Sequence, residues 1–275
     1  IEGFKELDGL AFAEAVRRAI LNDKQVVVYK AGKSEPGQNA ALGHTASIAG
    51  DYEICETVLR QSGAIVTKTM GDFNDLFYVA DTMHNKTING NRLGAISGAG
   101  FETVGMADSS HSDTFSLEMG VLEPHTNDRL SEILKAKRLD ALMEIRNPFD
   151  INPGADDEAH TLCTQAFVED PNIDAVVVGL DPASPMMRTL ADCPRPGFDI
   201  HSEESITQQL PKLVDALDKP IIGIVDGGSL YDPMIDMLKD KGVCTFRSCD
   251  QGVKALAHYI EARLNTAKIK NRHSN

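Results

Sequence analysis

Short apolar runs alternate with amphipathic stretches along the chain, and this alternation predicts its secondary structure. Runs with the length and composition of buried strands are Val26–Tyr29, Ala64–Thr67, Leu93–Ser97, Ala175–Leu180, Ile221–Asp226 and Val243–Arg247. Apolar residues with helical spacing lie between them, at Ile54–Gln61, Leu130–Leu139 and Ile206–Leu217. Strands that are apolar throughout and separated by helices are typical of parallel sheets covered on both faces. The pattern therefore predicts an α/β fold with αβα layers.

The polar, turn-rich stretch 84–91 (HNKTINGN) predicts a domain boundary. Residues 89–267 hold enough strand–helix repeats for one flavodoxin-like domain. Residues 1–88 hold too few strands for a complete doubly wound domain. We therefore expect them to be the C-terminal half of such a domain, whose first half is cut away or carried on another polypeptide. The polar residues 268–275 are expected to form a frayed tail.

Composition narrows the partners and the compartment. The chain has 275 residues, of which 42% are hydrophobic, and a formal net charge of -14. Nucleic acids and anionic membranes attract basic patches, so neither is expected as a main partner. The five cysteines contain no CxxC pair, which indicates no disulfide framework, no zinc site and a reduced, cytoplasmic compartment. No signal peptide and no apolar run near 18 residues is present, so we expect neither export nor a membrane span.

His44 is the first candidate for chemistry. It lies late in a predicted loop of small and polar residues, Lys30–Asp51, which follows the first strand. Imidazole can be phosphorylated on a ring nitrogen and gives up the phosphoryl group readily, so it suits a relay. A lone loop histidine usually has no role, and the loop by itself leaves both interpretations open.

A second candidate follows the strand Leu93–Ser97, where the small residues Gly98, Ala99 and Gly100 precede a predicted helix at Thr103–Asp108. Backbone N–H groups at a helix N-terminus bind anions, and glycine permits close approach. The turn is a candidate phosphate site, with an ordinary strand–helix turn as the alternative. It is no Walker A loop, because no GK[ST] follows.

Two further turns carry polar side chains. Asn147–Asp150 (NPFD) is interpreted as a structural turn and helix stop, with Asp150 as a cap or loop ligand. Asp226–Ser229 (DGGS) ends a predicted strand, where ligands bind in open α/β sheets, although a simple turn explains it equally well. We predict no metal site.

Together these segments resemble the NDP-forming acyl-CoA synthetases, which include ADP-forming acetyl-CoA synthetase and, more distantly, the α subunit of succinyl-CoA synthetase. The phosphohistidine segment of that family has the form K-A-G, about ten residues, S/G-H-T-G and then A-G. The matching positions here are Lys30–Gly32, Gly43–Ala46 and Ala49–Asp51. Ala46 stands where the family commonly has glycine.

Other segments support the resemblance by their order and spacing. Gln61–Ile65 (QSGAI) is similar to the family's Q-A-G-V-I, and Asn147–Asp150 to its N-P-x-D. Ser97–Gly100 (SGAG) is similar to S-N-A-G, with Gly98 in place of the asparagine, so the backbone rather than a side chain would make the contact there. Ile1–Gly3 (IEG) resembles the strand end Y-I-E-G, whose glutamate holds the phosphohistidine.

The resemblance implies an acid–thiol ligase that converts acid, CoA and ATP into acyl-CoA, ADP and phosphate. It implies that His44 carries the phosphoryl group on a swinging loop, that Glu2 holds the phosphohistidine, and that the amides of Gly98, Ala99 and Gly100 cradle a phosphate. It also implies ATP or ADP, CoA and Mg²⁺, bound mostly by an ATP-grasp domain or subunit and a CoA-binding Rossmann domain that this sequence lacks. The substrate would be a small carboxylic acid. An oligomer is expected, because an exposed half-domain needs a partner.

Two alternative functions stay open. A non-catalytic regulatory or scaffold relative would keep the fold, although the presence of both His44 and Glu2 argues against it. A flavodoxin-like module that binds FMN or a nucleotide is the other alternative, and a yellow colour of the pure protein would reveal a bound flavin.

Overall fold

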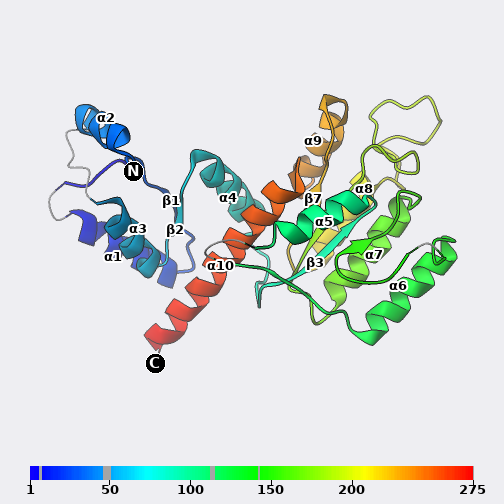
Figure 1. The fold of residues 1–275 in the computed structure, drawn as a ribbon, viewed down its shortest axis with the longest axis horizontal. Helices are drawn as coiled ribbons and strands as arrows, with labels where there is room; N and C mark the ends of the chain where they lie inside the picture. The colour runs from blue at the N-terminus through cyan, green and yellow to red at the C-terminus, as the bar shows by residue number, and fades with distance from the viewer. Residues whose placement is uncertain (6–7, 46–50, 112–114, 142, 275) are drawn as a thin grey trace. The chain divides into compact units, whose positions relative to one another are not determined.

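The computed structural model describes the chain except for residues 6–7, 46–50, 112–114, 142 and 275 (Figure 1). The described chain divides into two compact units. The first unit comprises residues 1–81 and 258–275, and the second comprises residues 82–257. The long helix α10 (Cys249–Ser274) contributes residues to both units.

The first unit is built around two parallel strands, β1 (Val27–Tyr29) and β2 (Ile65–Thr67). Its helices are α1 (Asp8–Leu21), α2 (Glu35–Thr45), α3 (Tyr52–Ser62) and α4 (Met70–Thr82), together with the C-terminal part of α10. Apolar side chains from the strands, from α1 and α3 and from α10 form one core. The buried members of this core are Val16, Ile20, Val28, Leu59, Ala64, Val66 and Ile269.

Local signals fix the ends of α3. The side chain of Asp51 accepts a hydrogen bond of 3.0 Å from the Ile54 amide and so caps the first turn. Gly63 ends the helix in the left-handed region with φ of 101°, and its amide bonds back to helix carbonyls. A Cβ atom at Gly63 would lie 2.9 Å from Cγ1 of Ile20 and 3.1 Å from Cδ1 of Ile269. Both the backbone conformation and the packing therefore require glycine in the QSGAI segment.

The second unit contains one parallel sheet with the strand order β4-β3-β6-β7-β8, and β5 also pairs with β3. Its strands are β3 (Arg92–Ser97), β4 (Glu118–Met119), β5 (Phe149–Asp150), β6 (Ala175–Gly179), β7 (Ile221–Ile224) and β8 (Cys244–Phe246). Its helices are α5 (Gly100–Asp108), α6 (Pro124–Ala136), α7 (Asp157–Glu169), α8 (Ile206–Ala216), α9 (Asp232–Asp240), the short 3₁₀ helix η1 (Ser229–Tyr231) and the first part of α10.

Helices cover both faces of this sheet. On one face, Val176 and Val178 of β6 share a core with buried residues of α6, α7, α8 and α9. On the other face, Gly252 of α10 lies against Ile222 and Ile224 of β7. The strand residues alternate between the faces, as the pleat requires. This layered arrangement confirms the predicted flavodoxin-like α/β fold (Figure 1).

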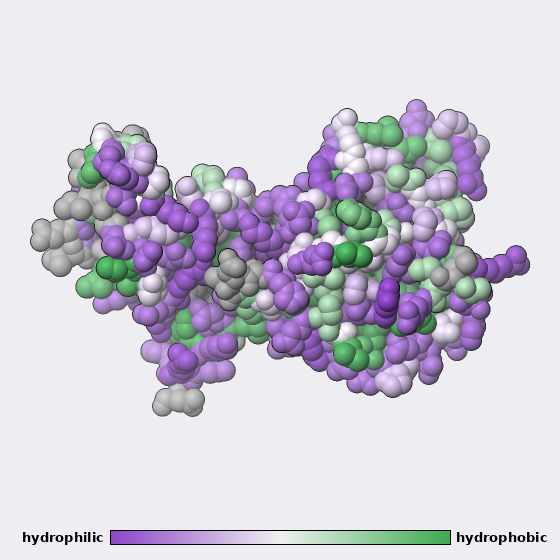
Figure 2. Space-filling view, in the orientation of Figure 1, coloured by the Kyte–Doolittle hydropathy of each residue, from purple (hydrophilic) through white to green (hydrophobic). Residues whose placement is uncertain are grey.

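The predicted strands are confirmed, with ends that shift by a residue or two. The strands β4 and β5 were not predicted, because each has two residues and includes an acidic one, Glu118 or Asp150, so neither forms an apolar run. Figure 2 shows that the face in view is largely hydrophilic, in line with the charged composition. Among the described helices, none is both long enough and apolar enough to cross a membrane.

Three expectations differ from the structure. Residues 35–45 were expected to be loop but form α2, because Ser34 caps the helix and alanine, leucine and glutamine favour it. The chain divides between residues 81 and 82 rather than after residue 88. Residues 268–274 continue the helix α10 instead of fraying, since Ile269 is buried in the core of the first unit. The polar residues around Ile269 had suggested an exposed tail.

The substitution Gly63→Ala tests the packing at the end of α3. We expect it to lower the free energy of unfolding by about 1–3 kcal/mol, because alanine is strained at positive φ and its methyl group would overlap Ile20. Urea or thermal unfolding measures the change. Gly43→Ala is the matched control, since an added Cβ there meets no described atom within 4 Å. Equal stabilities of the two variants would contradict the prediction.

Candidate functional site

In the first unit, the segment that begins the chain runs beside β1. The Ile1 amine donates a hydrogen bond of 2.8 Å to the Tyr29 carbonyl, and the Ala31 amide donates one of 2.9 Å to the Ile1 carbonyl. This pairing places Glu2 next to the end of β1. The IEG and KAG segments, which the sequence separates, therefore come together.

Lys30 fixes this arrangement from inside. Its residue surface is only 2% exposed, and its ammonium group donates to the carbonyls of Glu2 (2.7 Å) and Ala31 (2.6 Å). A buried ammonium group is costly unless its N–H groups are bonded, and these two carbonyls supply partners. The lysine of KAG thus positions the backbone of Glu2, a role that sequence reasoning did not assign. Two residues that are 28 apart along the chain had to be brought together to reveal it.

An open cleft of about 940 Å³ lies at this end of β1. Glu2 lines it, together with Tyr29, Lys33 and the start of α2. Ser34, at the rim, caps α2 by accepting a hydrogen bond of 3.3 Å from the Gly37 amide. The predicted holding residue therefore faces a space that is large enough for a small ligand.

His44 lies in the last turn of α2, in a helix rather than in a loop. The structure describes its backbone only, and residues 46–50 lie outside the described residues. The pairing of His44 with Glu2 therefore stays a prediction. What the structure does place is the helix that carries His44, since Ala40 and Ala41 of α2 line the cleft.

In the second unit, Gly98, Ala99 and Gly100 form the turn between β3 and α5. Ala99 is the N-cap of α5, and no side chain caps the helix there. The hydroxyl of Ser97 accepts a hydrogen bond of 3.0 Å from the Ala99 amide and donates one of 2.6 Å to Glu102. The turn thus has the backbone geometry expected for an anion site, whereas its use by phosphate stays a prediction.

Acidic side chains surround this turn. A Cβ at Gly98 would lie 3.0 Å from Oδ2 of Asp181 and 3.2 Å from Nε2 of His160. A Cβ at Gly100 would lie 2.5 Å from Oδ2 of Asp150. The space that an asparagine side chain would need at position 98 is therefore taken by Asp181 and His160, which explains the glycine in SGAG. Sequence reasoning did not bring these residues together, because they follow other strands.

His160 is a buried base beneath the turn. Its Nδ1 contacts the Asp156 carbonyl at 3.1 Å, so Nδ1 carries the proton. Its Nε2 has no hydrogen-bond partner among the described residues. Burial lowers the pKa of His160, which keeps the ring neutral, and burial raises the pKa of Asp181. Asp181 has φ of 36°, a strained conformation for aspartate.

Glu102 is the most perturbed acid of this cluster. Burial raises the pKa of its carboxyl group to about 7, the nearby charges of Asp226 and Asp181 act in the same direction, and the Ser97 hydrogen bond opposes them. The DGGS turn at Asp226 therefore takes part in the electrostatics of the site. Protonation of Glu102 near neutral pH reduces the negative charge that an anion at the turn would meet.

Asn147 has a structural role. Its amide group donates to the carbonyls of Leu93 (2.7 Å) and Gly120 (2.9 Å), and its Oδ1 accepts from the Ala95 amide (3.0 Å). The structural interpretation of NPFD thus holds, but the segment leads into the strand β5 rather than ending a helix. Asp150 bonds the Asn152 amide at 2.8 Å and stabilises the turn that follows.

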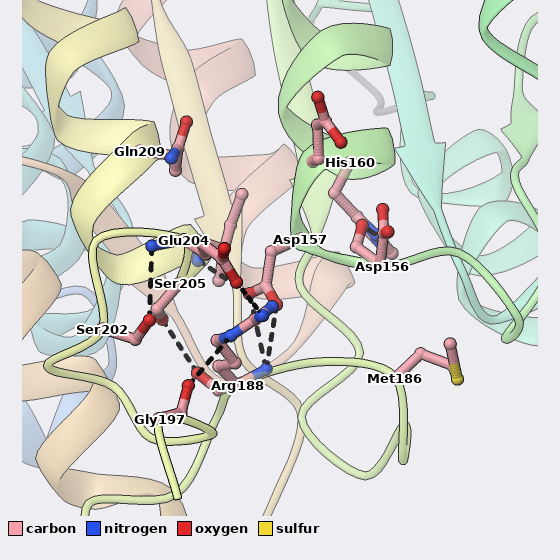
Figure 3. Close-up of polar contacts among 12 residues, drawn as sticks. Asp156, Asp157, His160, Met186, Arg188, Gly197, Ser202, Glu204, Ser205 and Gln209 are labelled. Atoms are coloured by element: carbon pink, nitrogen blue, oxygen red, sulfur yellow. Dashed lines mark hydrogen bonds and ion pairs between the residues drawn. The ribbon is translucent and has the colours of Figure 1, made fainter. Parts of the chain in front are cut away.

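A long irregular segment, residues 181–205, follows β6 and is anchored by the ion pairs of Arg188 (Figure 3). Arg188 donates to Asp157 at 3.0 Å, and Figure 3 shows its guanidinium group between Asp157 and Glu204. The Asp157 side chain is 1% exposed and also accepts a bond of 2.7 Å from the Ile206 amide. The anchor thus ties Arg188, within the segment, and Ile206, directly after it, to the start of α7. The sequence did not predict the pairing of Arg188 with Asp157, because the two residues are far apart along the chain.

Comparisons with known proteins agree with this architecture. Residues 1–81 match the family model described as the succinyl-CoA ligase like flavodoxin domain. The α subunit of acetate–CoA ligase (ADP-forming) II from Pyrococcus furiosus is 27% identical over 248 residues, which are 90% of this chain and 49% of that protein. Acetate–CoA ligase (ADP-forming) I from Archaeoglobus fulgidus is 34% identical over 179 residues, which are 65% of this chain and 24% of that protein.

A solved structure has the same fold. It is acetyl-coenzyme A synthetase 1 from Ca. Korarchaeum cryptofilum in complex with phosphate and ADP. The TM-score is 0.76 at 23% identity, and the match covers 98% of this chain and 53% of that one. The chain thus spans about half the length of the Pyrococcus furiosus α subunit and of this solved chain.

The parallel sheets, with their candidate sites at the carboxyl ends of the strands, define two flavodoxin-like α/β units, and residues 1–81 of the first match the succinyl-CoA ligase type. Together with the sequence matches, they make this chain similar to ADP-forming acetate–CoA ligases along most of its length.

The raised pKa of Glu102 predicts a pH dependence of stability. The folded protein keeps this proton up to about pH 7, whereas the carboxyl group ordinarily releases it near 4.5. The folded state therefore binds more protons between these values, and its free energy of unfolding falls as the pH rises through this window. We expect Glu102→Gln to remove the fall and to be more stable above pH 7 by on the order of 2 kcal/mol.

Urea unfolding of both proteins between pH 5 and 9 measures this difference. Glu118→Gln is the control, since it removes one exposed acid from the same sheet. If the Glu102→Gln curve runs parallel to that of the natural protein, Glu102 is not the group responsible.

Proposed function

We propose that this chain is the phosphohistidine-bearing part of an ADP-forming acyl-CoA synthetase. In the proposed reaction, ATP transfers its γ-phosphoryl group to a ring nitrogen of His44 and leaves as ADP. A carboxylate oxygen of the acid then takes the phosphoryl group from His44 and forms an acyl phosphate. The thiolate of CoA attacks the acyl carbon, and phosphate leaves as acyl-CoA forms.

One observation carries the proposal. Lys30 holds Glu2 at the end of β1, on a cleft whose wall continues into the helix that bears His44. A carboxylate that bonds one ring nitrogen fixes the tautomer of a histidine and leaves the other nitrogen to attack. Glu2 would act in this way as a positioning residue for His44.

The second unit would contribute a phosphate site at Gly98, Ala99 and Gly100. The Ala99 amide is bonded to Ser97, so the remaining amides of this turn and of the uncapped α5 N-terminus would attract the anion. The surrounding acids oppose it, and the neutral form of Glu102 lessens that opposition. An anion would therefore bind this turn more tightly below pH 7 than above it.

The nucleotide, CoA and the metal ion would be bound mainly by partner domains. Within the described residues, no group of three or more His, Cys, Asp or Glu side chains is arranged to hold a metal ion. Mg²⁺ would be bound with ATP on an ATP-grasp domain or subunit. A CoA-binding Rossmann domain and a small carboxylic acid complete the proposed assembly.

Phosphorylation of the assembled enzyme tests the proposal. With γ-labelled ATP and Mg²⁺, we expect an acid-labile, base-stable label on His44, located by mass spectrometry. His44→Asn should abolish the label and acyl-CoA synthesis, whereas His125→Asn, at an exposed histidine of the second unit, should change neither. Glu2→Gln should slow labelling by at least about tenfold, because the ring loses its positioning carboxylate.

The opposite result is equally informative. An intact assembly that binds nucleotide but takes up no label would show a scaffold relative of the family. A yellow protein with a flavin spectrum would instead support the FMN-binding alternative.

A further inference from the structure

A second cavity of the first unit lies between α1, the end of α3 and the C-terminal part of α10, with a volume of about 570 Å³. Its cationic residues are Arg17, Arg60 and Arg272. Buried Ile65 and Ile269 give it an apolar floor. The cavity shares no lining residue with the cleft at Glu2, so it is a separate site.

The charged residues that line this cavity are mainly positive, although the protein as a whole is negatively charged. The chain carries a formal net charge of -14, yet three arginines converge here with a single acid, Glu261, in the lining. Burial raises the pKa of Glu261, and the nearby charge of Arg60 opposes this rise. Such a concentration of positive charge in an acidic protein attracts a small anion.

Two of the arginines are held in place by hydrogen bonds that occupy only some of their N–H donors. Arg17 donates to the Gln61 carbonyl at 2.7 Å. Arg60 donates to the Val66 carbonyl at 2.8 Å and pairs with Glu56 at 2.9 Å. Because a guanidinium group has five N–H donors, most remain for a ligand, and the groups are already ordered.

These bonds also stabilise the end of α3, so they explain Arg17 and Arg60 as structural residues. They do not explain Arg272. It lies in the last turns of α10, is exposed, and has no ion-pair partner among the described residues. Lys270, two residues earlier, pairs with Asp23. Within the described part of the chain, Arg272 therefore adds a cation without an ion-pair partner to a cavity that already holds two ordered ones.

We propose that this cavity binds a phosphorylated small molecule with an apolar ring portion, such as a nucleoside diphosphate. The phosphates would contact Arg17, Arg60 and Arg272, since guanidinium groups bind phosphate oxygens in a bidentate way. The ring portion would lie on Ile65 and Ile269, and the side-chain amide of Asn265 offers a polar contact beside them. A volume of this size suits a ligand of that class.

Isothermal titration of the 275-residue chain at low salt tests the proposal, with ADP, pyrophosphate and adenosine as the probes. We expect saturable binding of ADP, weaker binding of pyrophosphate, which lacks the ring, and no binding of adenosine. Added salt should weaken ADP binding, because it screens the arginines.

Two matched variants locate the site. Arg272→Gln should weaken ADP binding about tenfold, the loss expected for one charged phosphate contact. Lys268→Gln removes the same charge from an exposed position of the same helix that does not line the cavity, and it should leave binding within about twofold. Thermal unfolding confirms that both variants are folded.

Three outcomes overturn the proposal. The first is no saturable binding of either ADP or pyrophosphate. The second is equal weakening by the two variants, which would indicate attraction by overall charge. The third is pyrophosphate binding as tight as that of ADP, which would show that the apolar floor takes no part.

Discussion

Both candidate sites depend on backbone segments that approach closely where parallel strands end. In the first unit, the buried ammonium group of Lys30 joins the carbonyls of Glu2 and Ala31 and so permits this approach. In the second unit, the absence of a side chain permits it, since Gly98 and Gly100 leave room for Asp181 and Asp150. Polar groups then gather at one edge of each sheet, as the parallel fold favours.

The acidic groups that gather in the second unit repel one another, and protonation of Glu102 reduces this repulsion. Asp150, Asp181 and Asp226 lie near a turn whose amides attract anions. Glu102 cannot remain fully ionised among them, and its pKa rises to about 7. The strained backbone of Asp181 belongs to the same arrangement. Strain, burial and repulsion thus occur together at the candidate anion site, a combination typical of functional sites.

The sequence predicted those parts of the fold that local patterns determine. Apolar runs such as Ala175–Leu180 identified the strands, because burial on both faces leaves no polar position. The helix α2 was missed although Ser34 and Glu35 at its start are a capping signal, since glycine and alanine around His44 suggested a loop. Contacts between distant residues, such as Arg188 with Asp157, depend on the folded topology and were beyond local reasoning.

In the candidate sites, too, the sequence identified residues but not the contacts between distant residues. The resemblance supplied His44, Glu2 and the SGAG turn, and the structure added the contacts that surround them. Nothing in the segment KAG predicted that Lys30 would be buried against two carbonyls. Nothing in SGAG predicted its acidic neighbours, because they are contributed by β5 and by the segment after β6.

The structure also separates the family motifs by the kind of role they have. Lys30 holds two backbone segments together, Gly63 ends α3 against Ile20, and Asn147 bonds two strand regions. A relative without activity would keep all three, because its fold needs them. Their presence therefore supports the fold rather than the reaction. The choice between an enzyme and a scaffold depends on His44 and on the carboxylate of Glu2, whose predicted roles are chemical.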